Sequence, residues 1–512
     1  MAKAKPTTQA EIIAVLSDPA SYHGHPPVER VDTHAARIFL AGPEAIKIKR
    51  PVRYSYLDFS TPERRRQALQ RELEINRPEA PEIYRDLVAI VRKPDGSLAL
   101  GGEGTPVDWA LRMHRFDGEL LLSKLAESGP LGDELIVTLA QRVDAYHRRA
   151  VAQRVVGLGA AAMSAILEEL STELGRLADG PTLAPLLAAC SRALEVARDV
   201  LDARAHVGFV RRCHGDLHLG NIVVIDDRPV LFDALEFDER LATIDTLYDL
   251  AFLVMDLDHR GQRAAANLLL NRYLIENGDD AGIAGLAALP LFLALRAAIR
   301  GMTELQRGGP KSLERGRSYL DAAASYAAPT APRLVAVGGF SGTGKSTLAH
   351  ALAPKLGPAP GALHLRSDVE RKRLLGTPEQ ERLPPETYTP AMSDRVYARL
   401  LDKAQLALRA GHAVVLDAVY STPEERTAVE ALAAALAVPF TGLWLAAAPD
   451  ILDARVTARR GDASDADAAV VSAQVARGAG IIDWPQIDAG SSPSATLDAA
   501  CAVLGLELGS HA

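Results

Sequence analysis

The sequence predicts an α/β multidomain protein whose two parts have different architectures. The clearest seam is "YAAPTAPR", residues 326–333, a Pro/Ala-rich linker followed directly by the apolar run "LVAVGG". After this seam, short apolar runs alternate with helical stretches, which favours a three-layer α/β domain with a parallel sheet. Before it, residues 28–100 look rich in strands around one helix, whereas residues 120–205 and 260–325 look mainly helical. The first part is therefore expected to have one strand-rich and one helical lobe.

These patterns set the expected domain boundaries. They are an N-terminal extension at 1–27, a two-lobed domain at 28–325 (lobes at about 28–110 and 115–325), the linker at 326–333 and an α/β domain at 334–508. The strands expected in the last domain are 334–338, 362–367, 413–417, 442–447 and 486–489.

Composition excludes several function classes. The 512 residues include 57 basic and 65 acidic ones, a net charge of −8, so there is no general basic footprint for nucleic acid or an anionic membrane. Three distant cysteines give neither a disulfide framework nor a metal cluster. The N-terminus lacks an apolar signal core, the run 431–449 is broken by Pro439, and the run 281–295 is short and contains Pro290. We expect a cytoplasmic protein with no membrane partner, and the oligomeric state stays open.

The stretch "GGFSGTGKST" fits the phosphate-binding pattern G-x4-G-K-[ST] from Gly339 to Ser346. Its glycines let backbone N–H groups turn toward phosphates, Lys345 would neutralise the β/γ-phosphates, and the Ser346 hydroxyl would hold Mg²⁺. An apolar strand before it and a helix after it argue against an accidental glycine-rich turn. The residues expected to bind nucleotide here are Gly339, Ser341, Gly342, Thr343, Gly344, Lys345, Ser346 and Thr347.

Two aspartates, Asp368 and Asp417, follow the second and third expected strands of this domain, where a parallel sheet presents its ligand crevice. With the arginines of "DARVTARRGD", they make residues 332–508 resemble small-molecule P-loop kinases, a P-loop NTPase fold. The resemblance implies that Asp368 orients or deprotonates an acceptor hydroxyl, that Asp417 supports Mg²⁺, and that Arg455 and Arg459 stabilise the transferred phosphoryl group. Asp368 could instead cap the next helix, and Arg459 could be an ordinary surface residue.

A second signature, "HGDLHLGN", lies upstream and is followed by Asp233. Its H-x-D-x4-N spacing resembles the catalytic loop of protein kinases, and H-G-D-x4-N is typical of the aminoglycoside phosphotransferase-like family. The region 28–325 is therefore expected to have that two-lobed protein-kinase-like (aminoglycoside phosphotransferase-like) fold. The resemblance implies that Asp216 is the catalytic base and that Asn221 and Asp233 ligate Mg²⁺. Asp249, in the following helix, is expected to be structural.

The same resemblance extends to the strand-rich lobe. In "AIKIKR", Lys47 would contact the α/β-phosphates, with Lys49 an open alternative because period-2 alternation puts both on one face. Glu72 is the expected partner of that lysine, with Glu74 a weaker candidate, and adenine would lie near the backbone of Met113. Residues 31–40 contain no glycine, and Asp233 is followed by Ala-Leu instead of Phe-Gly. The nucleotide contacts of this lobe are thus the least determined.

Together the motifs predict a bifunctional ATP- and Mg²⁺-dependent phosphotransferase that acts on hydroxyl groups of small molecules. The acids Glu236 and Asp238 favour an amino sugar or similar cationic alcohol as acceptor of the N-terminal half. Two alternatives stay open. One half could catalyse while the other senses nucleotide, or the P-loop half could be an ATP-driven switch that docks a protein partner.

Overall fold

The computed structural model describes residues 8–22, 24, 27–33, 35–54, 57–153, 158–177, 183–278, 280–458 and 461–506. The chain divides into two compact units. Unit 1 comprises Met1–Val155 and Gly208–Leu253, and unit 2 comprises Val156–Val207 and Val254–Ala512. Part of the helical region before the expected linker thus belongs to the same compact unit as the C-terminal α/β domain.

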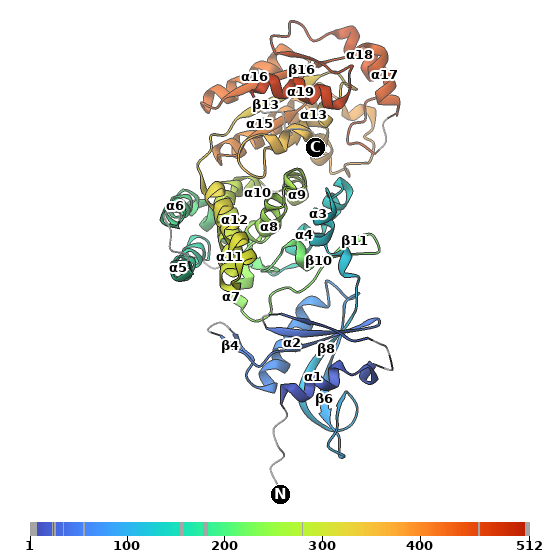
Figure 1. Ribbon diagram of the computed structural model, residues 1–512. Coiled ribbons are helices and arrows are strands. Elements are labelled where there is room, and N and C mark those ends of the chain that lie inside the picture. The colour runs from blue at the N-terminus through green and yellow to red at the C-terminus, as the bar shows by residue number, and fades with distance from the viewer. Residues whose placement is uncertain are drawn as a thin grey trace. The chain divides into compact units, whose positions relative to one another are not determined.

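Unit 1 contains a six-stranded antiparallel sheet, drawn in blue shades in Figure 1, with the order β1-β2-β3-β8-β6-β7. Its strands are β1 Glu29–Asp32, β2 Ala36–Ala41, β3 Glu44–Lys49, β6 Tyr84–Arg92, β7 Leu98–Leu100 and β8 Thr105–His114; β4 Arg53–Tyr54 and β5 Leu57–Asp58 form a separate pair. Alternation along β3 sends Ile46 and Ile48 into one apolar cluster and leaves Lys47 and Lys49 on the opposite face.

Helices α1 (Gln9–Ser17) and α2 (Pro62–Asn76) pack against this sheet. In α1, Ile12 and Leu16 join the cluster that contains Ile46 and Ile48, so residues expected to form an extension contribute to the lobe's core. In α2, the N-cap Thr61 accepts a hydrogen bond from the backbone N–H of Arg64, and Pro follows it, which are the usual signals for a helix start.

The rest of unit 1 consists of helices and two short strand pairs. The helices are α3 Leu122–Ser128, α4 Asp133–Arg149, α7 Glu239–Ala242 and the first part of α8 Thr246–His259; the pairs are β9 Val210–Arg212 with β12 Thr243–Asp245, and β10 Ile222–Ile225 with β11 Arg228–Leu231. The β10–β11 hairpin turns at Asp226 (φ 48°) and Asp227 (φ 59°). Two positive φ values are what a tight two-residue hairpin loop requires, and aspartate tolerates them better than most residues.

Unit 2 begins with a helical region. Its helices are α5 Ala160–Leu177, α6 Leu183–Val207, α9 Arg263–Asn277, α10 Asp280–Ala284, α11 Leu289–Arg307 and α12 Pro310–Ala327. The helical run Asp280–Arg307 has 28 residues and is long and apolar enough to cross a membrane, so the expectation that this run is too short was wrong. Its most apolar window is 78% buried, as in the core helix of a folded domain.

The C-terminal domain of unit 2 has a five-stranded sheet with the order β14-β15-β13-β16-β17, in which every neighbouring pair is parallel. The strands are β13 Leu334–Gly339, β14 Leu363–Arg366, β15 Val414–Asp417, β16 Phe440–Ala446 and β17 Gln486–Asp488; the helices are α13 Lys345–Leu352, α14 Ser367–Leu374, α15 Pro390–Arg409, α16 Pro423–Ala435, α17 Pro449–Ala458, α18 Ala468–Arg477 and α19 Pro493–Leu504. Helices α13 and α19 share a core cluster with four of the strands, and α15 and α16 also contact the sheet. The predicted parallel α/β architecture is confirmed.

Helix α9 binds the open edge of this sheet inside unit 2. The side chains of Asn267 and Asn271, both at least 95% buried, donate to the carbonyl of Ala362 at 3.0 and 3.2 Å. The Asn271 carbonyl oxygen accepts from the backbone N–H of His364 at 2.7 Å. These side-chain amides hydrogen-bond to backbone groups on edge strand β14 and beside its start.

His412, just before β15, should make the stability of the α/β domain depend on pH. Burial lowers the pKa of His412 from 6.5 to about 4, despite a hydrogen bond to the backbone of Gly361. Below pH 6.5 the unfolded chain binds a proton that the folded domain does not, so stability should fall by about 1.4 kcal/mol per pH unit until about pH 4. His412→Gln lacks this loss, so its unfolding temperature should improve relative to the wild type between pH 7 and 4.5. The exposed His206→Gln should show no such trend, and a constant gap for His412→Gln would contradict the prediction.

Candidate active sites

In unit 1, one buried carboxylate holds both candidate lysines. Glu72, fully buried on α2, accepts from Lys47 Nζ at 2.6 Å and from Lys49 Nζ at 2.7 Å. Lys47 Nζ also lies 2.7 Å from Asp233 Oδ1, whereas Lys49 Nζ lies 2.6 Å from Glu236 Oε1. Lys47 is therefore the lysine that links α2 to the predicted metal-binding aspartate, and the weaker candidate Glu74 is exposed on the other side of the helix.

Lys47, Glu72 and Asp233 stabilise one another's charged forms against the effect of burial. Burial alone lowers the pKa of Lys47, but Asp233 and Glu72 outweigh it and raise that pKa well above its ordinary value. Burial likewise tends to raise the pKa of Asp233, and the charge of Lys47 reverses this to a net lowering. Lys47 is thus held as a cation and Asp233 as an anion, the states that phosphate and metal binding require.

Three further residues position the segment around Asp233; the sequence analysis missed two of them and gave the third, Glu236, a different role. The backbone N–H of Ala234 donates to Asn76 Oδ1 at 2.8 Å, and that of Asp233 donates to the Tyr84 hydroxyl at 3.1 Å. Asp233 itself has φ 59°, a conformation that needs such support. Asn76 lies one helical turn after Glu72. Two polar residues four apart on the buried face of α2 were therefore the sequence signal that could have identified Asn76 as a site residue. Glu236 is the third, through its pair with Lys49.

The loop from His214 to Asn221 brings the other predicted residues together. The Asn221 amide nitrogen donates to the backbone carbonyl of Asp216 at 2.9 Å and to its Oδ2 at 3.1 Å. The backbone N–H of Phe232 donates to the carbonyl of Asn221 at 3.0 Å, and Asp233 is the next residue, just beyond the end of β11. Asn221 and Asp233 supply oxygen atoms, which Mg²⁺ prefers, so the donor set fits that metal.

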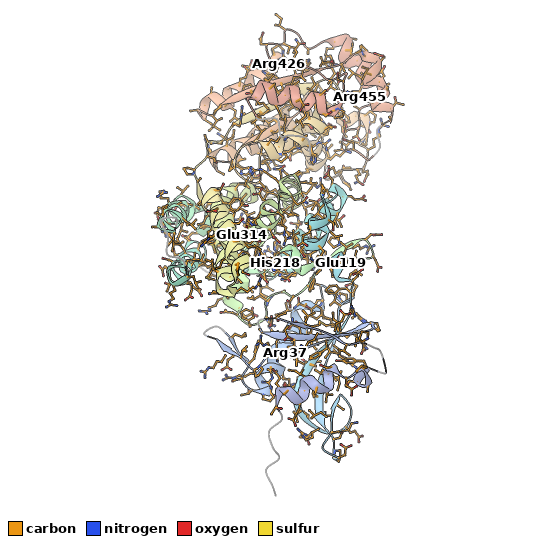
Figure 2. The ribbon with its side chains drawn as sticks, in the orientation of Figure 1. Arg37, Glu119, His218, Glu314, Arg426 and Arg455 are labelled. Carbon is orange, nitrogen blue, oxygen red and sulfur yellow. The ribbon has the colours of Figure 1, made fainter. Side chains whose placement is uncertain are left out.

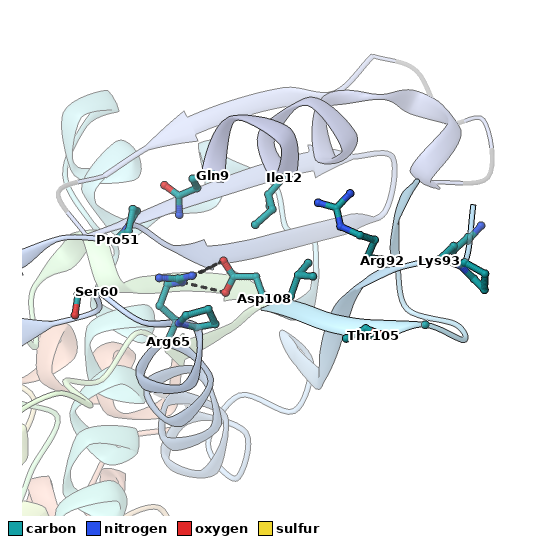
Figure 3. Close-up of a pocket in the computed structure, with 13 residues that line it drawn as sticks. Gln9, Ile12, Pro51, Ser60, Arg65, Arg92, Lys93, Thr105 and Asp108 are labelled. Atoms are coloured by element: carbon teal, nitrogen blue, oxygen red, sulfur yellow. Dashed lines mark hydrogen bonds and ion pairs between the residues drawn. The ribbon is translucent and has the colours of Figure 1, made fainter. Parts of the chain in front are cut away.

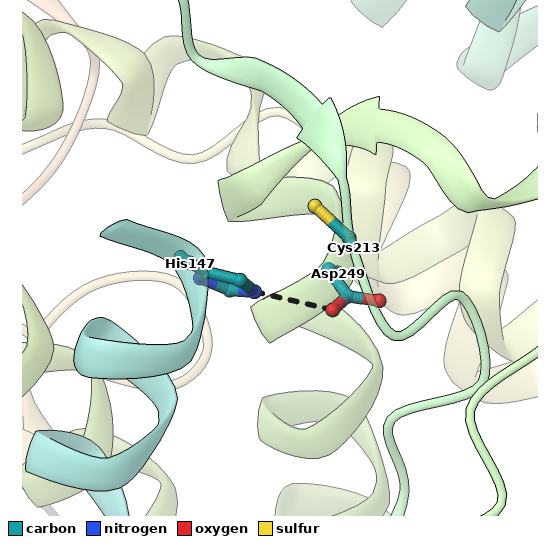
Figure 4. Close-up of side chains that lie close together, drawn as sticks. All are labelled: His147, Cys213 and Asp249. Carbon is teal, nitrogen blue, oxygen red and sulfur yellow. Dashed lines mark hydrogen bonds and ion pairs between the residues drawn. The ribbon is translucent and has the colours of Figure 1, made fainter. Parts of the chain in front are cut away.

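Asp249 braces this loop, as expected for a structural residue. Its Oδ2 accepts from the backbone N–H of His214 at 3.0 Å and lies 3.1 Å from His147 Nε2, and its Oδ1 accepts from the backbone N–H of Gly215 at 2.9 Å. Cys213 lies beside the pair, so a nitrogen, a sulfur and an oxygen ligand approach one another (Figure 4). Because both Asp249 oxygens already accept backbone hydrogen bonds, we interpret the cluster as a brace for the loop that carries Asp216.

The remaining predicted residues of unit 1, Met113, Glu236 and Asp238, make contacts within the chain that do not by themselves indicate a ligand. Met113 is paired in the sheet with both Ala45 and Tyr84, and its side chain lies in an apolar cluster with Val223 of the β10–β11 hairpin. Asp238 pairs with Arg240 at 3.0 Å and caps α7. Since Glu236 pairs with Lys49, both carboxylates proposed to attract an ammonium group have cationic partners within the chain.

In unit 2, the glycine-rich loop leads from β13 into α13 as the motif requires. Gly344 (φ 88°) is the N-cap of α13, and a Cβ on Gly342 would lie 2.7 Å from the carbonyl oxygen of Leu452. Lys345 Nζ donates to the carbonyl of Phe340 at 3.1 Å, and Ser346 Oγ donates to Asp417 Oδ2 at 2.5 Å. Thr347 is exposed on α13. The hydroxyl and carboxylate oxygens of the Ser346–Asp417 pair are again donors suited to Mg²⁺.

Asp417 has two basic neighbours that the sequence analysis did not single out. His364 Nε2 and Arg366 Nε lie 3.6 and 3.4 Å from Asp417 Oδ2. Burial opposes ionisation of Asp417, but His364, Arg366 and Lys345 together lower its pKa to about 2. For Asp368, on α14, burial dominates and raises the pKa of the carboxyl. The surroundings thus favour the charged form of the Asp417 carboxyl and the protonated form of the Asp368 carboxyl.

The segment 461–467 connects this site to its surroundings through three aspartates. Asp462 accepts from Arg366 at 2.9 Å, Asp465 from Lys372 at 3.2 Å and from the Tyr388 hydroxyl at 2.7 Å, and Asp467 from Arg382 at 3.2 Å. All three aspartates lie in the short stretch "GDASDAD". The sequence analysis did not single them out, because it considered only the arginines that precede this stretch.

No described contact brings Arg455, one of the two arginines expected to stabilise the transferred phosphoryl group, to the phosphate loop. Arg455, labelled in Figure 2, donates to the carbonyls of Ala489 (2.7 Å) and Ser491 (3.3 Å) after β17. Arg459 lies outside the described residues. A role of either residue at the transferred phosphoryl group stays a prediction.

Unit 1 also contains a cavity of about 650 Å³ bounded by α1, the start of α2, β6 and β8 (Figure 3). Its wall includes the buried pair of Arg65 and Asp108, whose Nη2 and Oδ2 atoms lie 2.9 Å apart. None of the predicted site residues lines it.

Comparison with known proteins places the chain in a family. The uncharacterized protein Rv2004c of Mycobacterium tuberculosis is 31% identical over 467 residues, which cover 88% of this chain and 90% of that protein. The chain belongs to the same family. Within it, residues 334–480 match the family described as "AAA domain".

Solved structures are also similar to each half. A choline/ethanolamine kinase family protein from Mesorhizobium loti is 15% identical, with a TM-score of 0.38, and covers 62% of this chain and 92% of its own. A gluconokinase from Sinorhizobium meliloti is 20% identical, with a TM-score of 0.25, over 34% of this chain and 92% of its own.

This member of the Rv2004c family therefore combines two kinase-like folds. The N-terminal one is protein-kinase-like, with a lysine–glutamate pair between β3 and α2 and an H-G-D-x4-N loop. The C-terminal one is a P-loop α/β domain.

Proposed function

We propose that the chain is a bifunctional phosphotransferase, each of whose folds transfers the γ-phosphoryl group of Mg-ATP to a hydroxyl group of a small molecule. The observation that carries the proposal is that the central charged residues of both motifs lie together within their own folds in one chain. Lys47 bridges Glu72 and Asp233 beside Asp216 and Asn221, and Ser346 is bonded to Asp417 at the end of the glycine-rich loop. Neither fold has lost the charged residues of its motif, as a relic would.

In the N-terminal fold, Lys47 would bind phosphate oxygens while Glu72 keeps its side chain in place. Asp216 would orient the acceptor hydroxyl and take its proton as the oxygen attacks the γ-phosphorus and ADP leaves. Asn221 and Asp233 would hold magnesium, which neutralises phosphate charge when bound. The brace from Asp249 would fix the loop so that the Asp216 carboxylate keeps its position.

In the P-loop fold, the acceptor would lie beside α14. Asp368 would accept the hydroxyl proton, and its raised pKa suits a group that must bind a proton during the reaction. Arg371 lies one turn later on the same helix and is 92% buried. Among the described residues, its Nε and Nη1 atoms have no hydrogen-bond partner. Two unsatisfied buried cationic donors favour an acceptor that carries a carboxylate or phosphate.

The test is a screen of the full-length chain for acceptor-dependent release of ADP. The panel contains neutral sugars, amino sugars, nucleosides, sugar acids, sugar phosphates and polynucleotide ends. At least one hydroxyl compound should raise turnover tenfold or more over the rate without acceptor, and anionic compounds should act through the P-loop fold. A slow ATPase that no acceptor stimulates would contradict the proposal.

A second candidate function is regulation of one fold by the other. It is favoured by the hydrogen bonds of Asn267 and Asn271 to the strand that leads to Asp368, because α9 lies in the region expected to form the first kinase domain. In that case ATP bound to one fold would change turnover in the other, and the acceptor screen would find substrates for one fold only.

A further inference from the structure

The cavity of unit 1 is separate from the residues assigned to either phosphotransfer site, none of which lines it. Its volume of about 650 Å³ is within the range of pockets that hold small organic molecules. Ile12, which lines it, belongs to the apolar cluster of Ile46 and Ile48, on the face of β3 opposite to Lys47 and Lys49. A ligand in this cavity would therefore be a different molecule from the ATP and the acceptor of the N-terminal fold.

One end of the cavity is held rigidly by the protein and is electrically neutral. Arg65 Nε and Nη2 lie 3.0 and 2.9 Å from the two carboxylate oxygens of Asp108, and both side chains are buried. Gln9, also in the wall, donates to the backbone carbonyl of Lys49 at 2.9 Å. Because these side chains already have partners within the chain, this part of the wall is preformed, which lowers the cost of ligand binding.

The other end carries an excess of positive charge. Arg92 and Lys93 line it, whereas Asp108 is the only carboxylate among the described residues of the wall. Arg92 is paired in register with Thr105, so a guanidinium and a hydroxyl lie on one face of the sheet. Glu11, outside the wall, lies 3.9 Å from Arg92 Nη2, beyond hydrogen-bond distance. Guanidinium, ammonium and hydroxyl groups are the donors that a carboxylate or phosphate accepts from.

Apolar side chains lie between the two ends. Figure 3 shows Ile12 between the Arg65–Asp108 pair and the guanidinium of Arg92. The other apolar residues of the wall are Val107, Pro51, Pro62 and Pro94. Apolar walls favour carbon atoms over charged groups, so a ligand that fills the cavity needs an apolar body as well as an anionic head.

We propose that this cavity binds a small organic anion, with a carboxylate or phosphate head on an apolar body, as a ligand separate from ATP and from both acceptors. The head accepts hydrogen bonds from Arg92, Lys93 and Thr105, and the body covers Ile12 and Val107. The Arg65–Asp108 pair bounds the far end of the body without attracting a charge.

Ligand-observed NMR on the full-length chain tests the proposal. The probes are hexanoate, benzoate and phenyl phosphate, each beside its neutral counterpart hexanamide, benzamide or phenol, and a saturating non-hydrolysable ATP analogue with Mg²⁺ is present throughout. At least one anion should bind at millimolar concentrations, about tenfold more tightly than its neutral counterpart. Hexanoate should bind several-fold more tightly than butanoate, because two more methylene groups contact the apolar wall. The comparison of benzoate with phenyl phosphate identifies the preferred head.

Variants of the wall place the binding in this cavity. Arg92→Gln should weaken binding of the anion about tenfold and Lys93→Gln about two- to fivefold, with no change for the neutral counterpart. Lys93 is exposed, so its substitution should leave the fold intact, and thermal unfolding checks the fold of Arg92→Gln. Arg30→Gln is the matched control, because it removes an exposed arginine from β1, the opposite edge strand of the same sheet. It should bind the anions like the wild type.

Any of four results would overturn the inference. They are that no anion binds, that the neutral counterparts bind equally well, that Arg92→Gln and Lys93→Gln bind like the wild type, or that Arg371→Gln abolishes binding. The last result would place the anions at the proposed acceptor site of the P-loop fold instead of in this cavity.

Discussion

Asp216→Asn should reduce phosphotransfer by the N-terminal fold about 100-fold or more, with little change in its affinity for ATP. An amide has nearly the shape of the carboxylate, but it binds no proton at the pH of the reaction. The loop itself should persist, since Asn221 also donates to the backbone carbonyl of residue 216. The loss would therefore report on proton transfer rather than on folding.

The measurement uses the full-length chain with Lys345→Ala, so that only the N-terminal fold turns over, and an acceptor from the screen. Asp227→Asn is the matched control, because it makes the same change at an exposed turn of the adjacent hairpin. Near-wild-type turnover in Asp216→Asn would show that Asp216 is not the base.

Lys345→Ala should lower the number of nucleotides bound per chain from two to one. Its ammonium group, which donates to the carbonyl of Phe340, is the charge that would face the β/γ-phosphates. Loss of a phosphate-facing lysine removes charge-assisted hydrogen bonds that backbone N–H groups alone do not replace. Titration calorimetry with a non-hydrolysable ATP analogue and saturating Mg²⁺ counts the sites.

Lys355→Ala, an exposed lysine shortly after α13, is the control and should still bind two. Asp233→Ala should weaken the other site, because Lys47 loses a partner and magnesium a ligand. A stoichiometry of one in the wild-type chain would exclude two working kinase sites.

The sequence predicted both folds because their strongest signals are local. The glycine-rich loop, the H-G-D-x4-N loop and the alternation of strands and helices all lie within short windows. The five strands of the α/β domain accordingly fall close to their expected positions. Local signals could not decide between Lys47 and Lys49, because both side chains lie on one face of β3. The contact that distinguishes Lys47 is with Asp233, which is 186 residues later in the chain.

The residues that the sequence analysis missed act across long sequence separations. Asn76 and Tyr84 accept hydrogen bonds from the backbone of the Asp233 segment, 158 and 149 residues later in the chain. Gln474 accepts one from the backbone of Ser341, 133 residues earlier. None belongs to a motif with fixed spacing, so periodicity indicates at most that Asn76 is buried. Arg455 shows the opposite case, because its described hydrogen bonds go to the carbonyls of Ala489 and Ser491 and not to the glycine-rich loop.

The asparagines of α9 have a consequence for any separation of the two halves. Strand β14 is the last strand on its side of a parallel sheet, and Asn267 and Asn271 bond to backbone groups on and beside it. A fragment that begins near residue 330 would lack α9 and expose these groups. Exposed edge strands recruit strands from other molecules, so such a fragment should self-associate. We therefore expect α9 to protect this edge from aggregation, and the α/β domain to need another cover for β14 when it is produced alone.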